Sequence, residues 1–192
     1  MSLTESTVRS PVLVVGGTGM LAGVVSALLR EGLTTVVVSR RPPGPTAFGS
    51  HSLADGLLVQ VNADYTEPIQ FAAALRAAAA RTGPFQQAIL WIHAEGRPHA
   101  YAAVADTLAT NPLVVEVLGS RAAAPATPAP RPPKALSRTR HRSVILGFTG
   151  PGSDTRWLAH EEISEGVLAA LRSPQDSGLH VVGRVRPWED RP

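Results

Sequence analysis

The sequence predicts an α/β fold in which a parallel β-sheet is covered by helices on both faces. Two observations lead to this prediction. Short apolar segments alternate with segments of helical periodicity along almost the whole chain of 192 residues, and the first apolar segment ends in a group of glycines. Apolar strands that alternate with crossover helices are typical of a parallel sheet buried on both faces. Since no internal repeat is apparent, residues 1–192 are expected to form a single domain.

Seven segments are predicted to be strands because each is short, apolar and rich in β-branched residues. They span residues 11–17, 33–39, 57–64, 87–93, 113–120, 143–148 and 179–185. The segment RRPPGP, which begins at Arg40, ends the second strand because neither a strand nor a helix continues through its prolines.

Four segments are predicted to be helices because apolar residues recur in them at helical spacing. They span residues 21–29, 67–81, 98–109 and 159–172. Gly32 stands where a C-terminal cap of the first helix belongs. Thr66 can cap the second helix, which tolerates Pro68 in its first turn. His160 is interpreted as a cap of the last helix.

The glycine group lies where the first strand passes into the first helix, in the stretch VVGGTGMLAG. Gly16 permits a tight turn, Gly19 lets the backbone approach a diphosphate closely, and Ala22 lets the helix pack against the strand. Free N–H groups at the start of the helix would face the anion. A tight turn without a ligand also uses glycines, but the position between a strand and a helix favours dinucleotide binding.

The composition narrows the kinds of site and location that are expected. The chain has no cysteine, which excludes disulfides, thiolate metal sites and cysteine nucleophiles and is typical of a reducing cytoplasm. No apolar run is long enough for a membrane span, and the first residues do not resemble a secretory signal. A cytoplasmic protein without a membrane partner is therefore expected. No spacing of histidines and carboxylates indicates a metal, and no Walker-type lysine indicates a nucleoside triphosphatase.

Residues 121–142 differ in composition from the rest of the chain. They contain six Lys or Arg residues, five prolines and no acidic residue. We interpret them as a flexible Pro/Arg-rich insertion that lies near the ligand crevice, since it follows the fifth strand. A clamp for phosphate or nucleic acid is the alternative. It is less favoured because the segment lacks the aromatic residues on which single-stranded nucleic acids stack.

Several stretches resemble the short-chain dehydrogenase/reductase family, in particular a group of small, shortened bacterial members. In the first half these are VVGGTGMLAG, VSRRP and NADYTE, and in the second half VLGS, VILGF and WLAHEEISEGVLAAL. The resemblance implies a single Rossmann-type, doubly wound parallel sheet with strand order 3-2-1-4-5-6-7. It also implies a nicotinamide cofactor. A homo-oligomer is compatible with the resemblance, because the family commonly forms dimers or tetramers, but the sequence leaves the oligomeric state open.

The same resemblance implies a set of cofactor-binding residues. They are Gly16, Gly17, Thr18, Gly19, Met20, Leu21, Ser39, Arg40, Arg41, Asp64, His93 and Ala94. Asp64 would lie beside the adenine, or alternatively serve as an acid flanking the helix in the DYTE turn. His93 and Ala94 occupy the place of the family's Asn-Ala-Gly stretch, where this chain has HAEG.

The second expected strand ends in VVVSRRPP, which bears on the choice of cofactor. Sites that prefer NAD place an acidic residue here, whose charge would repel a 2′-phosphate. This chain has Ser39 followed by Arg40 and Arg41, so NADP is the expected cofactor and NAD the less favoured one. The alternative is that the two arginines are ordinary solvated charges.

The family's catalytic residues are only partly present. Short-chain dehydrogenases use a Ser together with a Tyr-x-x-x-Lys pair, and Ser120 in VLGS matches the Ser. The two tyrosines, Tyr65 and Tyr101, and the single lysine, Lys134, do not form the pair. Ser120 and His93 remain as candidate catalytic residues, each with a purely structural alternative.

These observations lead to three hypotheses for the function. The first is an NADP(H)-dependent oxidoreductase with a non-standard active site that acts on a small molecule. The second is a catalytically silent NADP-binding sensor or partner-binding module. The third, in which the basic segment contacts nucleic acid, ranks last. The sequence does not identify the substrate, because the substrate loops of this fold vary freely.

Overall fold

A single parallel sheet organises the computed structural model, which describes residues 10–41, 44, 48, 57–175 and 177–192. The sheet has seven strands in the order β3-β2-β1-β4-β5-β6-β9, and each neighbouring pair is parallel. The strands are β1 (Val12–Val15), β2 (Thr35–Ser39), β3 (Leu58–Asn62), β4 (Phe85–Trp91), β5 (Leu108–Leu118), β6 (Arg140–Leu146) and β9 (Gly178–Val182).

The predicted strand order is confirmed for the first six strands and differs at the last one. The seventh position is taken by β9 because two further short strands, β7 (Phe148–Thr149) and β8 (Arg156–Trp157), come first along the chain. They pair antiparallel with each other in a separate sheet. The turn between them contains Gly150 at a φ of 89°, a backbone conformation that favours glycine.

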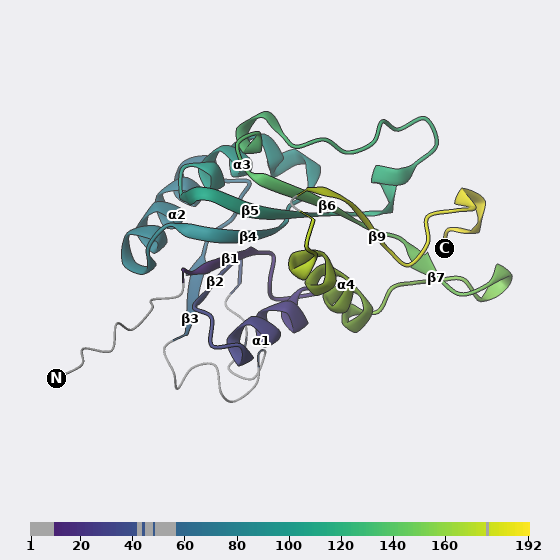
Figure 1. Cartoon of the computed structure of the whole chain (residues 1–192), viewed down its shortest axis with the longest axis horizontal. Coiled ribbons are helices and arrows are strands. Elements are labelled where there is room, and N and C mark those ends of the chain that lie inside the picture. Colours follow the sequence, from purple (N-terminus) through teal and green to yellow (C-terminus); the bar gives the residue numbers. More distant parts are fainter. Residues whose placement is uncertain (1–9, 42–43, 45–47, 49–56, 176) are drawn as a thin grey trace.

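Helices cover both faces of the sheet, as Figure 1 shows. One face carries α1 (Ala22–Arg30) and α4 (His160–Arg172), and the other carries α2 (Pro68–Thr82) and α3 (Arg97–Ala105). The strands are apolar on both sides, so each helix pair closes its own core. Val14 and Val117 belong to the core beneath α1 and α4, whereas Leu13 and Val114 belong to the core beneath α2 and α3.

Several predicted helix ends need correction. The third helix stops at Ala105 instead of residue 109, because Thr107 turns the chain by donating to the Val104 carbonyl at 2.8 Å and Leu108 then begins β5. Thr66 does not cap α2; its hydroxyl donates to Asp64. Gly32 follows α1 at a φ of 73° and donates to the carbonyl of Leu29, as expected for a glycine at this position.

The Pro/Arg-rich segment connects β5 to β6 on the side of α3 (Figure 1). It holds two short 3₁₀ helices, η2 (Ser120–Ala123) and η3 (Lys134–Leu136), and Leu136 is fully buried against the core beneath α3. The predicted boundary at residue 142 is wrong, since β6 begins at Arg140 and Arg142 is buried. The Pro/Arg-rich segment starts near the carboxyl end of β5 and ends at the amino end of β6.

None of the helices in the described part of the chain has the length and hydrophobicity needed to cross a membrane. The predictions about the N-terminal residues 1–9 and about positions 42, 43 and 45 of the turn after β2 concern residues outside the described part of the chain.

Candidate functional site

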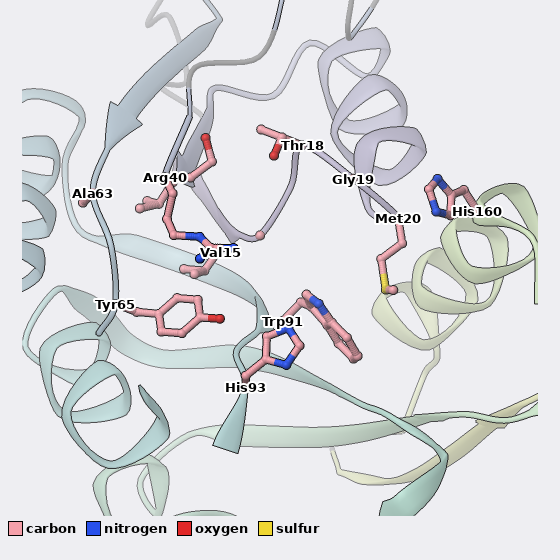
Figure 2. A pocket seen from close by; sticks show the side chains of 13 residues that line it. Val15, Thr18, Gly19, Met20, Arg40, Ala63, Tyr65, Trp91, His93 and His160 are labelled. Carbon is pink, nitrogen blue, oxygen red and sulfur yellow. The ribbon is translucent and has the colours of Figure 1, made fainter. Parts of the chain in front are cut away.

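A crevice of about 300 Å³ opens at the carboxyl ends of β1, β2 and β4 (Figure 2). Its lining consists of Val15, Gly16, Thr18, Gly19, Met20, Val38, Ser39, Arg40, Ala63, Tyr65, Trp91, His93 and His160. The chain runs from β1 outward to β3 and then returns to place β4 on the other side of β1. Open α/β sheets bind ligands at such a reversal of strand order, so the crevice occupies the position where a ligand is expected.

The glycine turn forms one wall of the crevice. Gly16 has a φ of 81°, and a Cβ atom there would lie 2.9 Å from the carbonyl oxygen of Trp91. At Gly19 a Cβ atom would meet no atom within 4 Å. The backbone of residue 19 is therefore open to a ligand, whereas Gly16 is required by the packing of the turn.

Two of the predicted cofactor residues lie beneath the turn and do not line the crevice. A Cβ atom on Gly17 would lie 3.0 Å from side-chain atoms of Val14 and Val25, so this glycine faces the core. Leu21 is fully buried in the same core. Both residues pack against the core beneath the turn.

Basic residues occupy the end of β2. Arg40 and Ser39 line the crevice, and Arg40, Arg41 and Thr18 line an adjoining hollow of about 350 Å³. The Ser39 hydroxyl donates to the carbonyl of Arg41 at 2.7 Å, which fixes the bend after the strand. The structure thus brings both arginines next to the glycine turn.

Asp64 lies beside the crevice with its carboxylate engaged in a local turn. Its Oδ1 accepts hydrogen bonds from the backbone N–H of Thr66 at 2.9 Å and from the Thr66 hydroxyl at 2.8 Å. The backbone hydrogen bond is the main reason why the pKa of Asp64 is lowered, and the charge of Arg40 adds to it. Its neighbours Ala63 and Tyr65 line the crevice, whereas Asp64 is not among the described lining residues.

Tyr65 is a residue that the sequence reasoning missed. Figure 2 shows its ring on the far side of the crevice from α4, on the same wall as Ala63. A Cβ atom on Gly96 would lie 2.3 Å from the ring, so the glycine makes room for the tyrosine. An aromatic residue directly after the third strand was the signal available in the stretch NADYTE.

The last residue of β4, Trp91, and His93 just after the strand place two aromatic rings on the floor of the crevice. His93 is exposed, and its ring meets that of Trp91 edge-on, with centroids 5.5 Å apart and an interplanar angle of 70°. Ala94 begins the short helix η1 (Ala94–Gly96) and is not among the described residues that line the crevice. The Arg97 side chain donates to the carbonyl of Ile92 at 2.9 Å and stabilises this bend.

A second, more apolar pocket of about 250 Å³ adjoins the crevice. It is lined by Met20, Trp91, Gly119, Ser120, Leu146, Gly147, Trp157, Leu158, His160 and Ile163. Three of these residues, Met20, Trp91 and His160, also line the crevice. Ser120 and His160 therefore line the same pocket, whereas His93 lines the crevice and is not among the described residues of the second pocket.

His160 does not cap α4 as predicted. Ala159 is the capping residue, and its N–H donates to the Glu162 carboxylate at 2.7 Å. Arg156 donates to the two oxygens of the same carboxylate at 2.8 and 3.1 Å. Mainly because of Arg156, the pKa of Glu162 falls to about 2. His160 is the first residue of the helix, and its exposed side chain is available to the two pockets.

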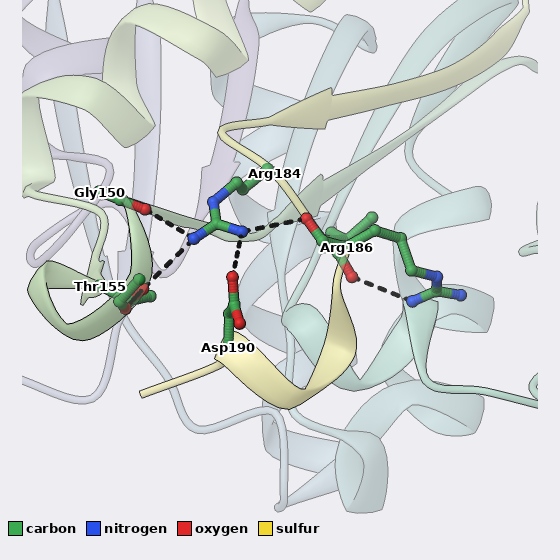
Figure 3. Close-up of polar contacts among 7 residues, drawn as sticks. Gly150, Thr155, Arg184, Arg186 and Asp190 are labelled. Carbon is green, nitrogen blue, oxygen red and sulfur yellow. Dashed lines mark hydrogen bonds and ion pairs between the residues drawn. The ribbon is translucent and has the colours of Figure 1, made fainter.

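The hairpin of β7 and β8, which contributes Trp157 to the second pocket, is held by Arg184 (Figure 3). The Arg184 guanidinium donates to the Gly150 carbonyl at 2.6 Å and to the Thr155 hydroxyl at 3.3 Å. It also pairs with Asp190 at 2.8 Å. The C-terminal segment therefore stabilises one wall of the pocket.

Neither Tyr101 nor Lys134 can replace the missing Tyr-x-x-x-Lys pair. Tyr101 is buried, and its hydroxyl donates to Glu116. Lys134 lines a different hollow at the amino end of β5, together with Asn111. Among the described residues no group of three or more histidine and carboxylate side chains could hold a metal ion.

No protein-family model matches the sequence, and no curated protein matches it. Solved structures match over nearly the whole chain. A short-chain dehydrogenase/reductase from Serratia marcescens BCRC 10948 has a TM-score of 0.63 at 15% identity, covering 92% of this chain and 98% of its own. A short chain dehydrogenase from Burkholderia cenocepacia J2315, in complex with NADP, has a TM-score of 0.64 at 15% identity and covers 92% and 97%.

A third match is an NADH-dependent reductase, A1-R′, complexed with NAD. Its TM-score is 0.66 at 14% identity, and the match covers 93% of this chain and 97% of that one. At this identity the likeness concerns the fold. Together with the parallel sheet and the glycine turn, it leads to one conclusion: this chain has the short-chain dehydrogenase/reductase fold.

Proposed function

We propose that the protein binds NADP(H) and is an oxidoreductase with a non-standard active site. The observation that carries the proposal is the crevice at the strand reversal, where Gly19 leaves the backbone open beside the start of α1. A diphosphate fits such a turn because free N–H groups and the helix dipole favour an anion. Solved structures with the same fold contain NAD or NADP, which supports a nicotinamide dinucleotide as the ligand.

The preference for NADP(H) rests on the basic end of β2. Arg40 lines both the crevice and the adjoining hollow, and Arg41 lines the hollow. A guanidinium can bind a 2′-phosphate through two parallel hydrogen bonds. No acidic side chain is among the described residues that line either cavity, so none of these lining residues would repel the phosphate.

The substitution Gly19→Ala tests cofactor binding directly. The fold should tolerate the added methyl group, since no atom lies within 4 Å of its position. In a complex the methyl group would crowd the diphosphate at a cost of about 1–3 kcal/mol, which weakens binding by about 5- to 150-fold. Calorimetric titration with NADPH measures the affinity, and the thermal midpoint of the variant is the control. Unchanged affinity would contradict the proposal.

Arg40→Ala is expected to weaken NADPH binding and to leave NADH binding unchanged. A charge-assisted hydrogen bond contributes roughly 1.5–3 kcal/mol, so the loss of affinity for NADPH should be about 10- to 150-fold. Arg76→Ala is a matched control, because Arg76 is exposed on α2 and lines neither cavity. Calorimetric titration of the unmodified protein, Arg40→Ala and Arg76→Ala with NADPH and with NADH measures these affinities. Equal affinity of the unmodified protein for NADPH and NADH would rule out the preference.

A catalytically silent NADP-binding protein, a sensor or partner-binding module, is the second candidate function. It is favoured by the positions of Tyr101, which is buried against Glu116, and of Lys134, which lies away from the crevice. Both candidates require cofactor binding, and they differ in whether hydride reaches a carbonyl compound. Oxidation of bound NADPH by a small carbonyl probe therefore separates them.

A further inference from the structure

We propose that His160 donates the proton in carbonyl reduction and that the apolar pocket beside it accepts a small, neutral ketone or aldehyde. This inference rests on the proposed function. Its basis is the place of His160 at the junction of the two cavities, since its side chain lines both the cofactor crevice and the second pocket. Figure 2 shows the imidazole at the start of α4, next to Met20 of the glycine turn.

The first turn of α4 is packed tightly against the glycine turn. Ser164, one helical turn after His160, donates from its hydroxyl to the Met20 carbonyl at 3.0 Å. A Cβ atom on Gly23 would lie 2.7 Å from the Ser164 hydroxyl oxygen, so α1 and α4 approach each other closely here. These contacts fix the position of His160 relative to the cofactor crevice.

The start of the helix is also fixed from the hairpin side. Glu162 accepts from the N–H of Ala159 and from both terminal nitrogens of Arg156. A reacting group must be held by its surroundings to within about 0.5 Å of a productive geometry, and a helix start that is stabilised on two sides meets this need better than a loop does.

The character of the second pocket indicates the class of substrate. Six of its lining side chains are apolar or aromatic: Met20, Trp91, Leu146, Trp157, Leu158 and Ile163. No lysine, arginine, aspartate or glutamate is among its described lining residues. A neutral apolar compound therefore fits the pocket, whose volume is about 250 Å³. Besides the indole N–H groups of Trp91 and Trp157, the side chains of Ser120 and His160 could donate hydrogen bonds to a carbonyl oxygen within it.

The proposed step balances when one proton from solvent is counted together with NADPH and the carbonyl compound. Hydride leaves C4 of NADPH and forms the new C–H bond at the carbonyl carbon, which is reduced while the cofactor is oxidised to NADP⁺. The carbonyl π bond breaks toward oxygen, and the imidazolium form of His160 supplies the proton that completes the alcohol and is left as neutral imidazole. Ser120 stabilises the developing negative charge by a hydrogen bond. Solvent returns the proton to the exposed His160 after release.

The test uses the full chain, NADPH and 1-phenyl-1,2-propanedione, a neutral carbonyl compound that is largely apolar. His160→Gln and His160→Ala should lower kcat by about 10²- to 10⁴-fold, the range for loss of a general acid. Binding of NADPH, measured by calorimetry, should stay unchanged. Added imidazole should restore part of the rate to His160→Ala and none to His160→Gln, because only the smaller side chain leaves room for it. His99→Gln is the control, since His99 is exposed on α3 and lines neither pocket.

Three results would overturn the inference. The first is binding of NADPH without reduction of the probe by the unmodified protein, which leaves the cofactor proposal standing. The second is a full rate in both His160 variants. The third is rescue by imidazole of His93→Ala in place of His160→Ala, which would move the proton donor to the floor of the crevice. Failure to bind either NADPH or NADH would instead refute the proposed function itself.

Discussion

Replacing Glu116 with alanine is expected to lower the free energy of unfolding by about 1–3 kcal/mol for each buried polar group that is left without a partner. Glu116 lies on β5 and is 4% exposed. Its carboxylate accepts a hydrogen bond from the Tyr101 hydroxyl of α3 and lies 3.3 Å from Nε2 of His141 on β6. Without the carboxylate, two buried polar side chains would lose their partner at once.

The charge of Glu116 makes this contribution dependent on pH. Burial alone would raise the pKa of the carboxyl group, but hydrogen bonds from His141 and Tyr101 and the nearby charge of Arg97 outweigh it, so the pKa is lowered. A carboxyl group with a lower pKa in the folded state stabilises the fold above its unfolded pKa. This stabilisation should be fully present above the ordinary value of 4.5 and be lost as the pH falls below it.

Urea denaturation at neutral and acidic pH measures both effects. Glu116→Gln is the matched variant, because it keeps the shape and an oxygen acceptor while it removes the charge. It should be less destabilised than Glu116→Ala at pH 7, and its stability should fall less steeply on acidification. Equal stability of the alanine variant and the unmodified protein would show that the buried network contributes nothing.

The sequence carried enough information to predict the sheet and most of the crevice. β1 is a continuous apolar run and β4 ends in one, which is typical of a sheet covered on both faces. Gly16 and Gly19 are recognisable because a turn of this kind has few other solutions. Arg40 and Arg41 were predicted to bind the cofactor because they follow the second strand, where sites that prefer NAD place an acidic residue.

Features that depend on contacts between distant segments were not predictable in the same way. The short strands β7 and β8 have two residues each, too few to show a period. His160 was interpreted as a cap because its place in the pocket that Met20 and Ser120 also line arises only when α4 packs on α1. Asp64 was predicted to lie beside the adenine or, alternatively, to serve as an acid in the DYTE turn, and its carboxylate accepts hydrogen bonds from Thr66 within that turn.

Arg142 illustrates the same limit within the basic segment. Counted with its neighbours, it is one of six positive charges in a Pro-rich stretch and was assigned to a flexible insertion. In the structure it belongs to β6 and is 2% exposed. Charge counts do not reveal that the end of α4, about thirty residues later in the chain, presents its free carbonyl groups to this side chain.

Arg142→Ala should lower the free energy of unfolding by about 3 kcal/mol or more, because hydrogen bonds to a charged group contribute roughly 1.5–3 kcal/mol and several are lost together. One guanidinium nitrogen donates to the carbonyls of Ala170 and Leu171 at 2.6 and 2.9 Å. The other donates to Ser173 at 2.8 Å and also to Gln175. The positive charge at the C-terminus of α4 further stabilises the helix dipole.

Arg172, which lies in the last turn of α4 itself, provides the control. Arg172 pairs with Glu31 at the surface, where exposed ion pairs contribute about 0–1 kcal/mol, so Arg172→Ala should have little effect. Arg142→Lys should fall between the two, since it keeps the charge but reaches fewer carbonyls. Urea denaturation followed by circular dichroism ranks the three variants. If Arg142→Ala were no less stable than Arg172→Ala, the buried guanidinium would not be the cap that holds the end of α4 against β6.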